Sequence, residues 1–333
     1  MKRLDTVSNP ESAEKTVLPV IILLGPTGVG KTETVNKLLD SSYEIINADS
    51  MQVYRYLDIG AAKPSRQTLE RIKYHLIGLV EPSFQFNAGM FVHHTEDLIR
   101  EISGRRKLPV IVGGTAFYLR SFIFGLPASP PGDLEIREEL KRLHIEKGNL
   151  FIYNKLQEVD VRSAEKIGAA DTYRIIRALE VFRVTGKPLS SFQVPGTVRK
   201  DYNFLLIGLN REREELYKRI DSRVDRMFER GLVKEIVSLM ERGCKWDDPG
   251  MQGIGYREFF EMQKGCLSIG GLRELIKRNS RRYAKRQLTF LRSLPEVLWF
   301  DPGQITAIRE TISRFLDKQV HKSLLDSLPP SFA

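Results

Sequence analysis

The residues with the clearest chemical potential form one run, Gly25-Pro26-Thr27-Gly28-Val29-Gly30-Lys31-Thr32. The run fits the pattern G-x-x-x-x-G-K-T, follows five apolar residues (20–24) and precedes a helical stretch over 33–39. A strand, a glycine loop and a helix in this order are typical of a P-loop. Glycines let backbone N–H groups turn inward, Lys31 supplies a positive charge for terminal phosphates, and Thr32 offers a hydroxyl to Mg²⁺. The run predicts a site for a diphosphate or triphosphate, and leaves open which part of that molecule is transferred.

An acidic candidate, Asp49, ends the short strand predicted over 43–48. In a parallel sheet, functional residues lie just past the C-terminal ends of strands, so this carboxylate is expected near the phosphate site. Capping of the turn that follows is the alternative interpretation. The next buried strand, predicted over 108–112, also ends in small residues, Gly113-Gly114-Thr115. We therefore expect the two strand ends to meet beside the glycine loop.

Basic residues are the third group of candidates. Arg219 and Arg223 lie four positions apart, on one face of a helix predicted over 211–242. They fit either phosphate contact or salt bridges to Glu215 or Asp225. A second helix, predicted over 272–292, carries eight Lys or Arg residues and one acidic residue. Contact with a nucleic-acid backbone is favoured there over a merely solvated face.

Bulk properties bound the class of protein. The chain has 333 residues and a formal net charge of +10, which favours a polyanionic partner. Two cysteines are too few for a disulfide framework, and they indicate reduced thiols in a cytoplasmic protein. Residues 1–16 lack the apolar core of a signal peptide, and no apolar run approaches the ~20 residues that cross a bilayer. We expect no membrane association.

The pattern of elements predicts an α/β fold: a P-loop NTPase-like core with a parallel sheet and a helical insertion. Breaker residues over 125–132 end the first part of the core, and the following segment is helical over 133–147, 150–158, 163–167 and 172–185. The predicted organisation is a flexible tail (1–16), a core domain with C-terminal helices (17–118 and 201–317), a helical insertion that clamps a large substrate (119–200), and a second flexible tail (318–333).

These residues alone leave three functions open. A kinase would move phosphate from ATP, but the insertion lacks the closely spaced arginines of a kinase lid. An enzyme acting on nucleic acid would release the diphosphate as a leaving group. A nucleotide-gated RNA-binding module would perform no chemistry. No apolar strand with a terminal Asp, other than the one ending at Asp49, provides a convincing Walker B element.

Over about residues 18 to 300 the sequence resembles the tRNA dimethylallyltransferases, also called tRNA isopentenyltransferases or the IPP transferase family. The resemblance rests on ordered motifs in addition to the glycine loop. They are Asn47-Ala48-Asp49-Ser50-Met51-Gln52-Val53-Tyr54, Asp58-Ile59-Gly60, Ala62-Lys63-Pro64, Val112-Gly113-Gly114-Thr115, Arg174, Arg177-Ala178-Leu179-Glu180-Val181, Gly255-Tyr256-Arg257 and Tyr283-Ala284-Lys285-Arg286-Gln287-Leu288-Thr289. The sequence departs from the family at Gly28, where Ala or a similar residue is usual, and at Ala61, where Thr is usual.

The resemblance implies transfer of a dimethylallyl group from dimethylallyl diphosphate to N6 of adenine 37, next to the tRNA anticodon, with release of diphosphate. The implied partners are dimethylallyl diphosphate, the tRNA anticodon stem-loop and Mg²⁺, and a monomer is expected. The alternatives are a P-loop kinase or an adenylate prenyltransferase that acts on a free nucleotide.

The resemblance also implies roles for single residues. Asp49 matches the base, Thr27 the hydroxyl near the bridging oxygen, and Lys31, Arg219 and Arg223 the cations that favour departure of diphosphate, with Arg223 preferred. The glycine loop, Gly25 to Thr32, would hold the diphosphate, and Thr32 the metal. The implied tRNA-binding residues are Asp49, Ser50, Met51, Gln52, Thr115, Arg137, Tyr173, Arg174, Ile175, Ile176, Arg177, Gln252, Gly255, Tyr256 and Arg257.

Overall fold

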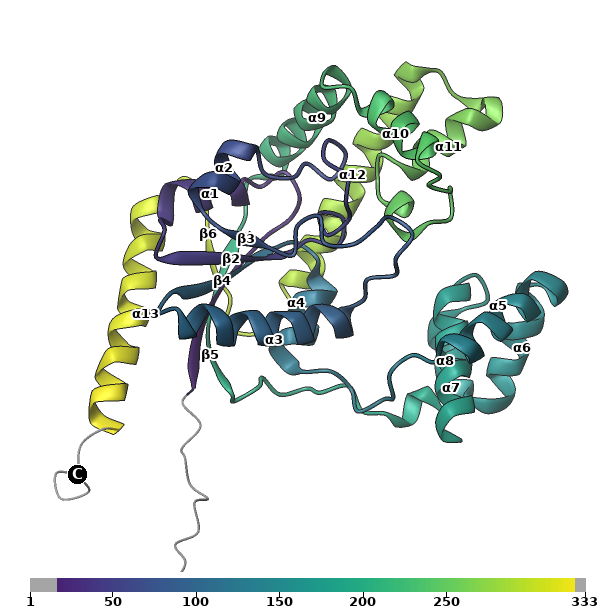
Figure 1. The fold of residues 1–333 in the computed structure, drawn as a ribbon, viewed down its shortest axis with the longest axis horizontal. Coiled ribbons are helices and arrows are strands. Elements are labelled where there is room, and N and C mark those ends of the chain that lie inside the picture. Colours follow the sequence, from purple (N-terminus) through teal and green to yellow (C-terminus); the bar gives the residue numbers. More distant parts are fainter. Residues whose placement is uncertain (1–16, 327–333) are drawn as a thin grey trace, which may run out of the picture. The chain divides into compact units, whose positions relative to one another are not determined.

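The computed structural model describes residues 17–326 and contains one sheet of six parallel strands (Figure 1). The strand order is β3-β2-β4-β1-β5-β6. The strands are β1 (Leu18–Leu24), β2 (Tyr43–Ala48), β3 (Tyr74–His75), β4 (Leu108–Gly113), β5 (Tyr202–Leu209) and β6 (Leu298–Phe300). This sheet confirms the predicted α/β class.

The register of the three central strands brings their C-terminal ends together. Leu24 of β1 pairs with Gly113 of β4, which in turn pairs with Ala48 of β2. Gly113 permits this approach, because a Cβ there would lie 2.1 Å from the Ala48 carbonyl oxygen. The segments that begin at Gly25, Asp49 and Gly114 therefore leave the sheet side by side.

The chain divides into two compact units. The core unit comprises the described residues up to Ser121 and from Arg199 onward. Its helices are α1 (Lys31–Leu38), α2 (Arg66–Arg71), α3 (Ala88–Gly104), α9 (Arg213–Glu229), α10 (Leu232–Glu241), α11 (Arg257–Glu261), α12 (Ile269–Leu291) and α13 (Ile305–Asp326), with α4 (Ala116–Phe124) at the junction and short helical turns η2 (Pro249–Gln252) and η3 (Met262–Cys266).

Apolar side chains on alternate strand positions form the core of this unit. Ile21, Leu23 and Ile207 belong to one buried cluster. Residues of α1, α9, α12 and α13 complete the same cluster, and α3 packs against β2 and β4. Consecutive residues of β1, β2 and β4 are buried, and successive strand side chains point to opposite faces, so the sheet is buried on both sides, as parallel sheets usually are.

The second unit, Phe122–Val198, is helical and has its own core. It contains α5 (Leu134–Lys147), α6 (Asn149–Val159), α7 (Val161–Ile167), α8 (Thr172–Thr185) and the short turn η1 (Leu189–Ser191). Aspartates begin three of these helices: Asp133, Asp160 and Asp171 accept hydrogen bonds from first-turn N–H groups. These bounds agree closely with the helices expected from the sequence.

The structure differs from the sequence interpretation at two places. The single helix expected over 211–242 is two helices, because Gly231 adopts φ 96° between α9 and α10. A tail was expected from residue 318, but residues 318–326 belong to α13, which continues to Asp326. The expected tail over 1–16, and residues 327–333 of the other, lie outside the described residues. Within residues 17–326, no helix combines the length and the apolar character that a membrane crossing requires.

Candidate active site

The glycine loop connects β1 to α1, as its sequence predicts. Gly28 and Gly30 have φ values of 80° and 109°, in the region that favours glycine. Gly28 also has no room for a side chain, because a Cβ would lie 2.7 Å from Ile220 Cγ1. Gly30 begins α1 without a side-chain cap, so the first N–H groups of the helix stay available to an anion.

Lys31 folds back over this loop. Its Nζ donates hydrogen bonds to the carbonyl oxygens of Gly25 (2.8 Å) and Pro26 (3.0 Å). Burial lowers the pKa of Lys31 from 10.5 to about 8; nearby Asp49 opposes this effect and Arg223 reinforces it. No carboxylate among residues 17–326 forms an ion pair with Lys31, so its charge is available to a bound phosphate.

Asp49 follows β2 directly and lines a pocket of about 280 Å³. One carboxylate oxygen, Oδ1, accepts a hydrogen bond from the Met51 N–H at 2.9 Å. The capping interpretation therefore holds for this oxygen. The neighbouring Ser50 N–H donates to Thr115 Oγ1 (2.9 Å), which ties the end of β2 to the end of β4. These contacts fix the carboxylate beside the pocket.

The pocket combines a polar end with an apolar wall. Its polar lining includes Thr27 of the glycine loop, Asp49 and Arg223. The apolar wall comes mainly from α9 and α12 and consists of Ile220, Val224, Met227, Ile254 and Ile276. Such a lining suits a ligand with an anionic end and a short hydrocarbon part.

The two candidate arginines of α9 have different surroundings. Arg219 supports the glycine loop from outside the pocket: its Nε donates to the Gly28 carbonyl oxygen at 3.1 Å, and its Nη2 lies 2.6 Å from Glu33. Arg223 lines the pocket, where burial lowers its pKa against the attraction of Asp49. Within the described part of the chain, Arg223 makes no hydrogen bond or ion pair. Its guanidinium therefore suits a bound anion better than that of Arg219.

The alternative salt bridges considered for these arginines are absent from the described residues. Glu215 pairs with Arg211, and Asp225 pairs with Lys277 at 2.8 Å. Arg211 instead contributes to the loop, because its Nε donates to the Val29 carbonyl oxygen at 2.9 Å.

Gln287 is a functional candidate that the sequence interpretation did not single out. This buried residue of α12 accepts a hydrogen bond from the Thr27 N–H (2.9 Å) and donates one to the Gly114 carbonyl oxygen (2.7 Å). One turn earlier, Tyr283 lines the pocket, and burial with the nearby Asp49 charge raises its pKa to about 12. The spacing of four puts both polar side chains on one helix face, a signal that the density of basic residues concealed.

Several residues that were expected to contact tRNA lie around the same pocket. Ser50, Met51, Gln252 and Arg257 line it. Tyr256, in contrast, is fully buried and donates a hydrogen bond to Glu235 at 2.7 Å. Gly255 is also buried, and its N–H donates to Glu258 at 2.7 Å. This burial argues against direct tRNA contact by Tyr256 or Gly255 and assigns them a packing role.

In the helical unit, too, some of the residues expected to contact tRNA are exposed and others are buried. Tyr173 and Arg174 are exposed at the start of α8. Ile175 and Ile176 belong to the buried core of the unit, which argues against their direct contact with tRNA.

Arg137 and Arg177 of this unit share the buried carboxylate of Glu180, at 2.9 Å and 2.8 Å. One carboxylate faces two guanidinium groups, so this cluster retains a net positive charge.

No group of three or more His, Cys, Asp or Glu side chains in residues 17–326 is arranged to hold a metal ion. Thr32 is exposed in the first turn of α1, where its hydroxyl is accessible to solvent. A divalent cation at this place would need most of its ligands from a bound phosphate and water, as is usual for Mg²⁺.

The parallel sheet, the glycine loop and its lysine define a protein of the P-loop class. The profile of the IPP transferase family matches residues 52–294. The chain therefore belongs to the IPP transferase family.

Relatives and solved structures agree with this assignment. A tRNA dimethylallyltransferase of Acetivibrio thermocellus is 41% identical over 298 residues, which cover 88% of this chain and 95% of the relative. A tRNA dimethylallyltransferase of Clostridioides difficile is 42% identical over 295 residues, with 88% and 94% covered.

Among crystal structures, a tRNA isopentenylpyrophosphate transferase from Bacillus halodurans is similar with a TM-score of 0.66 and 36% identity, covering 92% of this chain and 99% of the other. A eukaryotic dimethylallyltransferase described as acting on tRNA matches with a TM-score of 0.71 and 26% identity, over 94% and 80% of the two chains.

Proposed function

We propose that this chain is a tRNA dimethylallyltransferase. It transfers the dimethylallyl group of dimethylallyl diphosphate to N6 of the adenine next to the tRNA anticodon. The observation that carries this proposal is that Asp49, Arg223 and Thr27 of the glycine loop line one pocket together with an apolar wall. Action as a monomer in the cytoplasm remains a prediction.

The donor would bind with its diphosphate at the glycine loop. Backbone N–H groups at the start of α1, the charge of Lys31 and the Arg223 guanidinium favour the anionic diphosphate end. The dimethylallyl part would lie against the wall formed by Ile220, Val224 and Met227. The contacts to phosphate groups alone would bind ATP equally well. The apolar wall is therefore the feature that favours a prenyl donor.

Asp49 would act as the base for the acceptor. The exocyclic amine of adenine is a weak nucleophile, since its lone pair is delocalised into the ring. As the bond from N6 to the allylic carbon forms, the bond from that carbon to the diphosphate oxygen breaks, and the N6 proton passes to the Asp49 carboxylate. A positioned base of this kind contributes roughly 10²–10⁴-fold to a rate. The cations at the loop favour departure of the diphosphate.

The residues at this site fit a Mg²⁺ ion that would be coordinated largely by oxygens of the diphosphate. Thr32 would supply the protein ligand, and the bound ion would neutralise charge that develops on the leaving diphosphate. Such a role agrees with the lack of an acidic metal cluster in the described residues.

The acceptor adenine must leave its stack to reach the pocket, and this costs least in a single-stranded loop. We place Ser50, Met51, Gln52, Gln252 and Arg257 at the target base and its neighbours. Thr115 would act there mainly through the Ser50 N–H that it binds. In the helical unit, Tyr173 and Arg174 are exposed, and Arg137 and Arg177 carry excess positive charge for the RNA backbone.

Product analysis tests this proposal. The protein is incubated with radiolabelled dimethylallyl diphosphate, Mg²⁺ and either bulk tRNA or AMP, and the nucleosides are separated after digestion. We expect label in N6-(dimethylallyl)adenosine from tRNA and none in AMP. Label in AMP alone would identify an adenylate prenyltransferase. In a parallel incubation with ATP in place of the prenyl donor, ATP hydrolysis by a protein without prenyl transfer would identify a kinase-like enzyme.

A further inference from the structure

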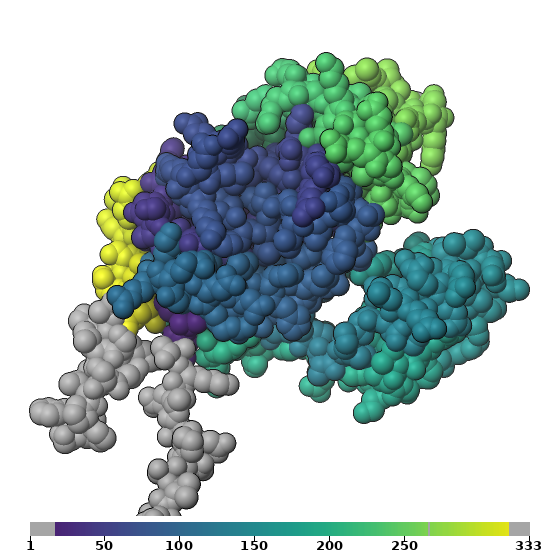
Figure 2. All heavy atoms as spheres, in the orientation of Figure 1, coloured from purple at the N-terminus to yellow at the C-terminus, as the bar shows by residue number. Residues whose placement is uncertain are grey.

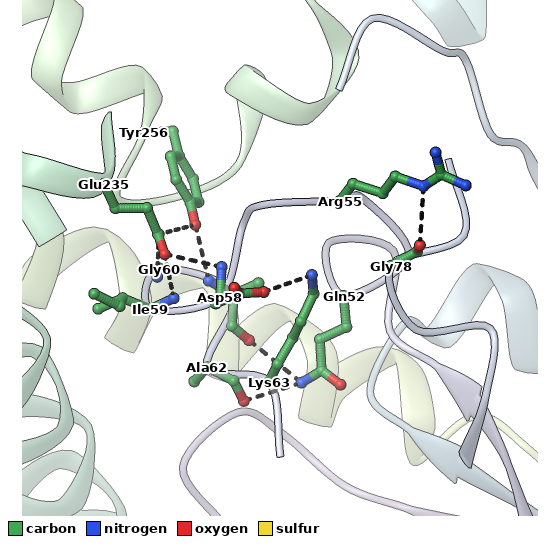
Figure 3. A network of polar contacts seen from close by, with 11 residues as sticks. Gln52, Arg55, Asp58, Ile59, Gly60, Ala62, Lys63, Gly78, Glu235 and Tyr256 are labelled. Atoms are coloured by element: carbon green, nitrogen blue, oxygen red, sulfur yellow. Dashed lines mark hydrogen bonds and ion pairs between the residues drawn. The ribbon is translucent and has the colours of Figure 1, made fainter. Parts of the chain in front are cut away.

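Glu235, on α10, accepts four hydrogen bonds, three of them from consecutive backbone N–H groups (Figure 3). Its Oε2 accepts from the N–H groups of Asp58 (3.0 Å) and Ile59 (2.7 Å). Its Oε1 accepts from the Gly60 N–H (3.0 Å) and the Tyr256 hydroxyl (2.7 Å). All four contacts use the carboxylate as an acceptor, so Glu235 ties three consecutive backbone N–H groups and the Tyr256 hydroxyl to α10.

The loop held in this way, residues 58–62, forms part of the active-site pocket. Gly60 and Ala61 line the pocket directly. Tyr256 supports the loop from behind, since its hydroxyl also accepts from the Ala61 N–H (3.2 Å), and a Cβ on Gly60 would lie 2.5 Å from its ring. In the space-filling view, the green residues that follow residue 210 lie directly against the blue N-terminal half of the unit (Figure 2).

The same loop orients a residue proposed to contact tRNA. The Gln52 amide nitrogen donates to the carbonyl oxygens of Ala61 and Ala62, both at 3.3 Å. Glu235 therefore acts on Gln52 through the backbone of two intervening residues. Thr27 and Arg223, proposed for the donor, belong to the glycine loop and α9 and do not contact this loop through any hydrogen bond among the described residues.

We propose that Glu235, together with Tyr256, is a positioning residue that presets the RNA-binding end of the site. It holds loop 58–62 so that the pocket wall and Gln52 are in place before the anticodon loop binds. This inference rests on the proposed function, and it predicts an effect on RNA binding that is separate from donor binding. Preorganisation of this kind lowers the cost of association.

Replacement by glutamine is diagnostic at this position. Glutamine has the size of glutamate, but one orientation of its amide sets the NH₂ against the N–H groups of Asp58 and Ile59, and the other sets it against the Gly60 N–H. The loop must then shift, although no volume is lost. Glu241→Gln removes the same charge from the exposed end of the same helix and is the matched control.

The test measures KM for an anticodon stem-loop RNA and for dimethylallyl diphosphate, together with direct RNA binding by fluorescence anisotropy. For Glu235→Gln we expect KM and Kd for the RNA to rise about tenfold, a loss of about 1.4 kcal/mol. Donor KM, and kcat at saturating RNA, should stay within about twofold. Tyr256→Phe should raise KM and Kd for the RNA about threefold, and Glu241→Gln should leave both constants unchanged.

Unchanged RNA affinity in a folded Glu235→Gln variant, or an equal rise in both KM values, would overturn this inference. If Glu235→Gln does not fold, as judged by circular dichroism, Tyr256→Phe carries the test, because it retains the packed ring. A wild-type enzyme without prenyl transfer would contradict the proposed function, whereas the anisotropy measurements would still decide whether Glu235 positions an RNA site.

Discussion

The pocket places two cationic side chains, Lys31 and Arg223, near the Asp49 carboxylate. Burial lowers the pKa of both Lys31 and Arg223, and the Asp49 carboxylate raises both. Two cations near one carboxylate leave a net positive charge in a partly desolvated place, where it attracts anions more strongly than in bulk water. A diphosphate neutralises this excess, and its departure restores it. The charges therefore favour binding of the donor.

The lowered pKa of Lys31 predicts a pH dependence of donor use. Below its pKa of about 8 the ammonium is charged and attracts diphosphate; above that pH the charge is lost. We expect kcat/KM for dimethylallyl diphosphate to fall as the pH rises through about 8, because this ratio reports pKa values of the free enzyme. Lys31→Arg, which stays charged, should abolish this decline between about pH 7 and 9. An identical decline in Lys31→Arg would assign the titration to another group.

Substitution of Asp49 separates its chemical role from its turn-forming role. Asn at this position retains an oxygen that can accept the Met51 N–H, now bonded at 2.9 Å, but it cannot take the N6 proton. For Asp49→Asn we expect the single-turnover rate to fall roughly 10²–10⁴-fold, with tRNA affinity nearly unchanged. Near-normal turnover would remove Asp49 as the base, and lost tRNA binding would indicate a structural effect.

Among the helices, α12 links the two ends of the site. Its inner face carries Tyr283 and Gln287 to the pocket and the glycine loop, while Lys285 and Arg286 are exposed, and Arg286 also lines the rim of the pocket. The sequence predicted this helix and its basic surface, because charge density is a local property. The contacts of Gln287 with Thr27 and Gly114 join residues far apart in the chain, and no local pattern indicates them. The same holds for Glu235 and loop 58–62.

In the helical unit, removal of the Glu180 carboxylate would leave Arg137 and Arg177 half-buried without their shared partner. It would also remove the acceptor of the Asp133 N–H, now bonded at 2.8 Å. Breaking a buried pair in this way typically costs 3–5 kcal/mol, so we expect Glu180→Ala to lower the free energy of unfolding of this unit by about 3 kcal/mol. Urea unfolding followed by circular dichroism measures the change.

Glu139→Ala is the matched control for this prediction. Glu139 is an exposed residue of α5 that pairs with Arg183 at 2.8 Å, and exposed pairs contribute ~1 kcal/mol or less. Equal losses in the two variants would contradict a special role for the buried Glu180.

At the scale of the whole molecule, a net charge of +10 indicates a polyanionic partner without locating its binding surface. Arg282, Lys285, Arg286, Thr289 and Phe290 of α12 line a shallow surface depression, which combines positive charge with an aromatic ring. This arrangement is typical of surfaces that hold single-stranded RNA. The basic face therefore extends the proposed acceptor site beyond the pocket.

Charge reversal on this face tests its contribution. We expect the double variant Lys285→Glu, Arg286→Glu to weaken tRNA binding at least about tenfold and to reduce the salt dependence by about two phosphate contacts. The control reverses Arg314 and Lys318 of α13, exposed residues that line neither depression nor pocket. Filter binding at several salt concentrations measures both quantities. Equal effects of the two double variants would mean that α12 contributes only to the overall charge of the protein and does not form a specific binding surface.

The order of elements and the position of the glycine loop were predictable, because apolar runs and glycine spacing are encoded locally. The break at Gly231 was not, since the apolar stripe continues through both α9 and α10 and only the backbone of one residue interrupts them. Burial of Tyr256, Ile175 and Ile176 was missed because a motif marks which residues matter, and gives no information about whether their side chains face a ligand or the core.

The central claim is that the glycine loop holds a prenyl diphosphate whose carbon part is transferred and whose phosphate part departs. A donor labelled with ¹⁴C in the dimethylallyl group and ³²P in the terminal phosphate tests it most directly, in a reaction with tRNA. We predict that ¹⁴C appears in the tRNA while all ³²P is recovered as diphosphate, and that Lys31→Ala weakens use of this donor. Recovery of ³²P in the tRNA, or the lack of ¹⁴C there, would contradict the account.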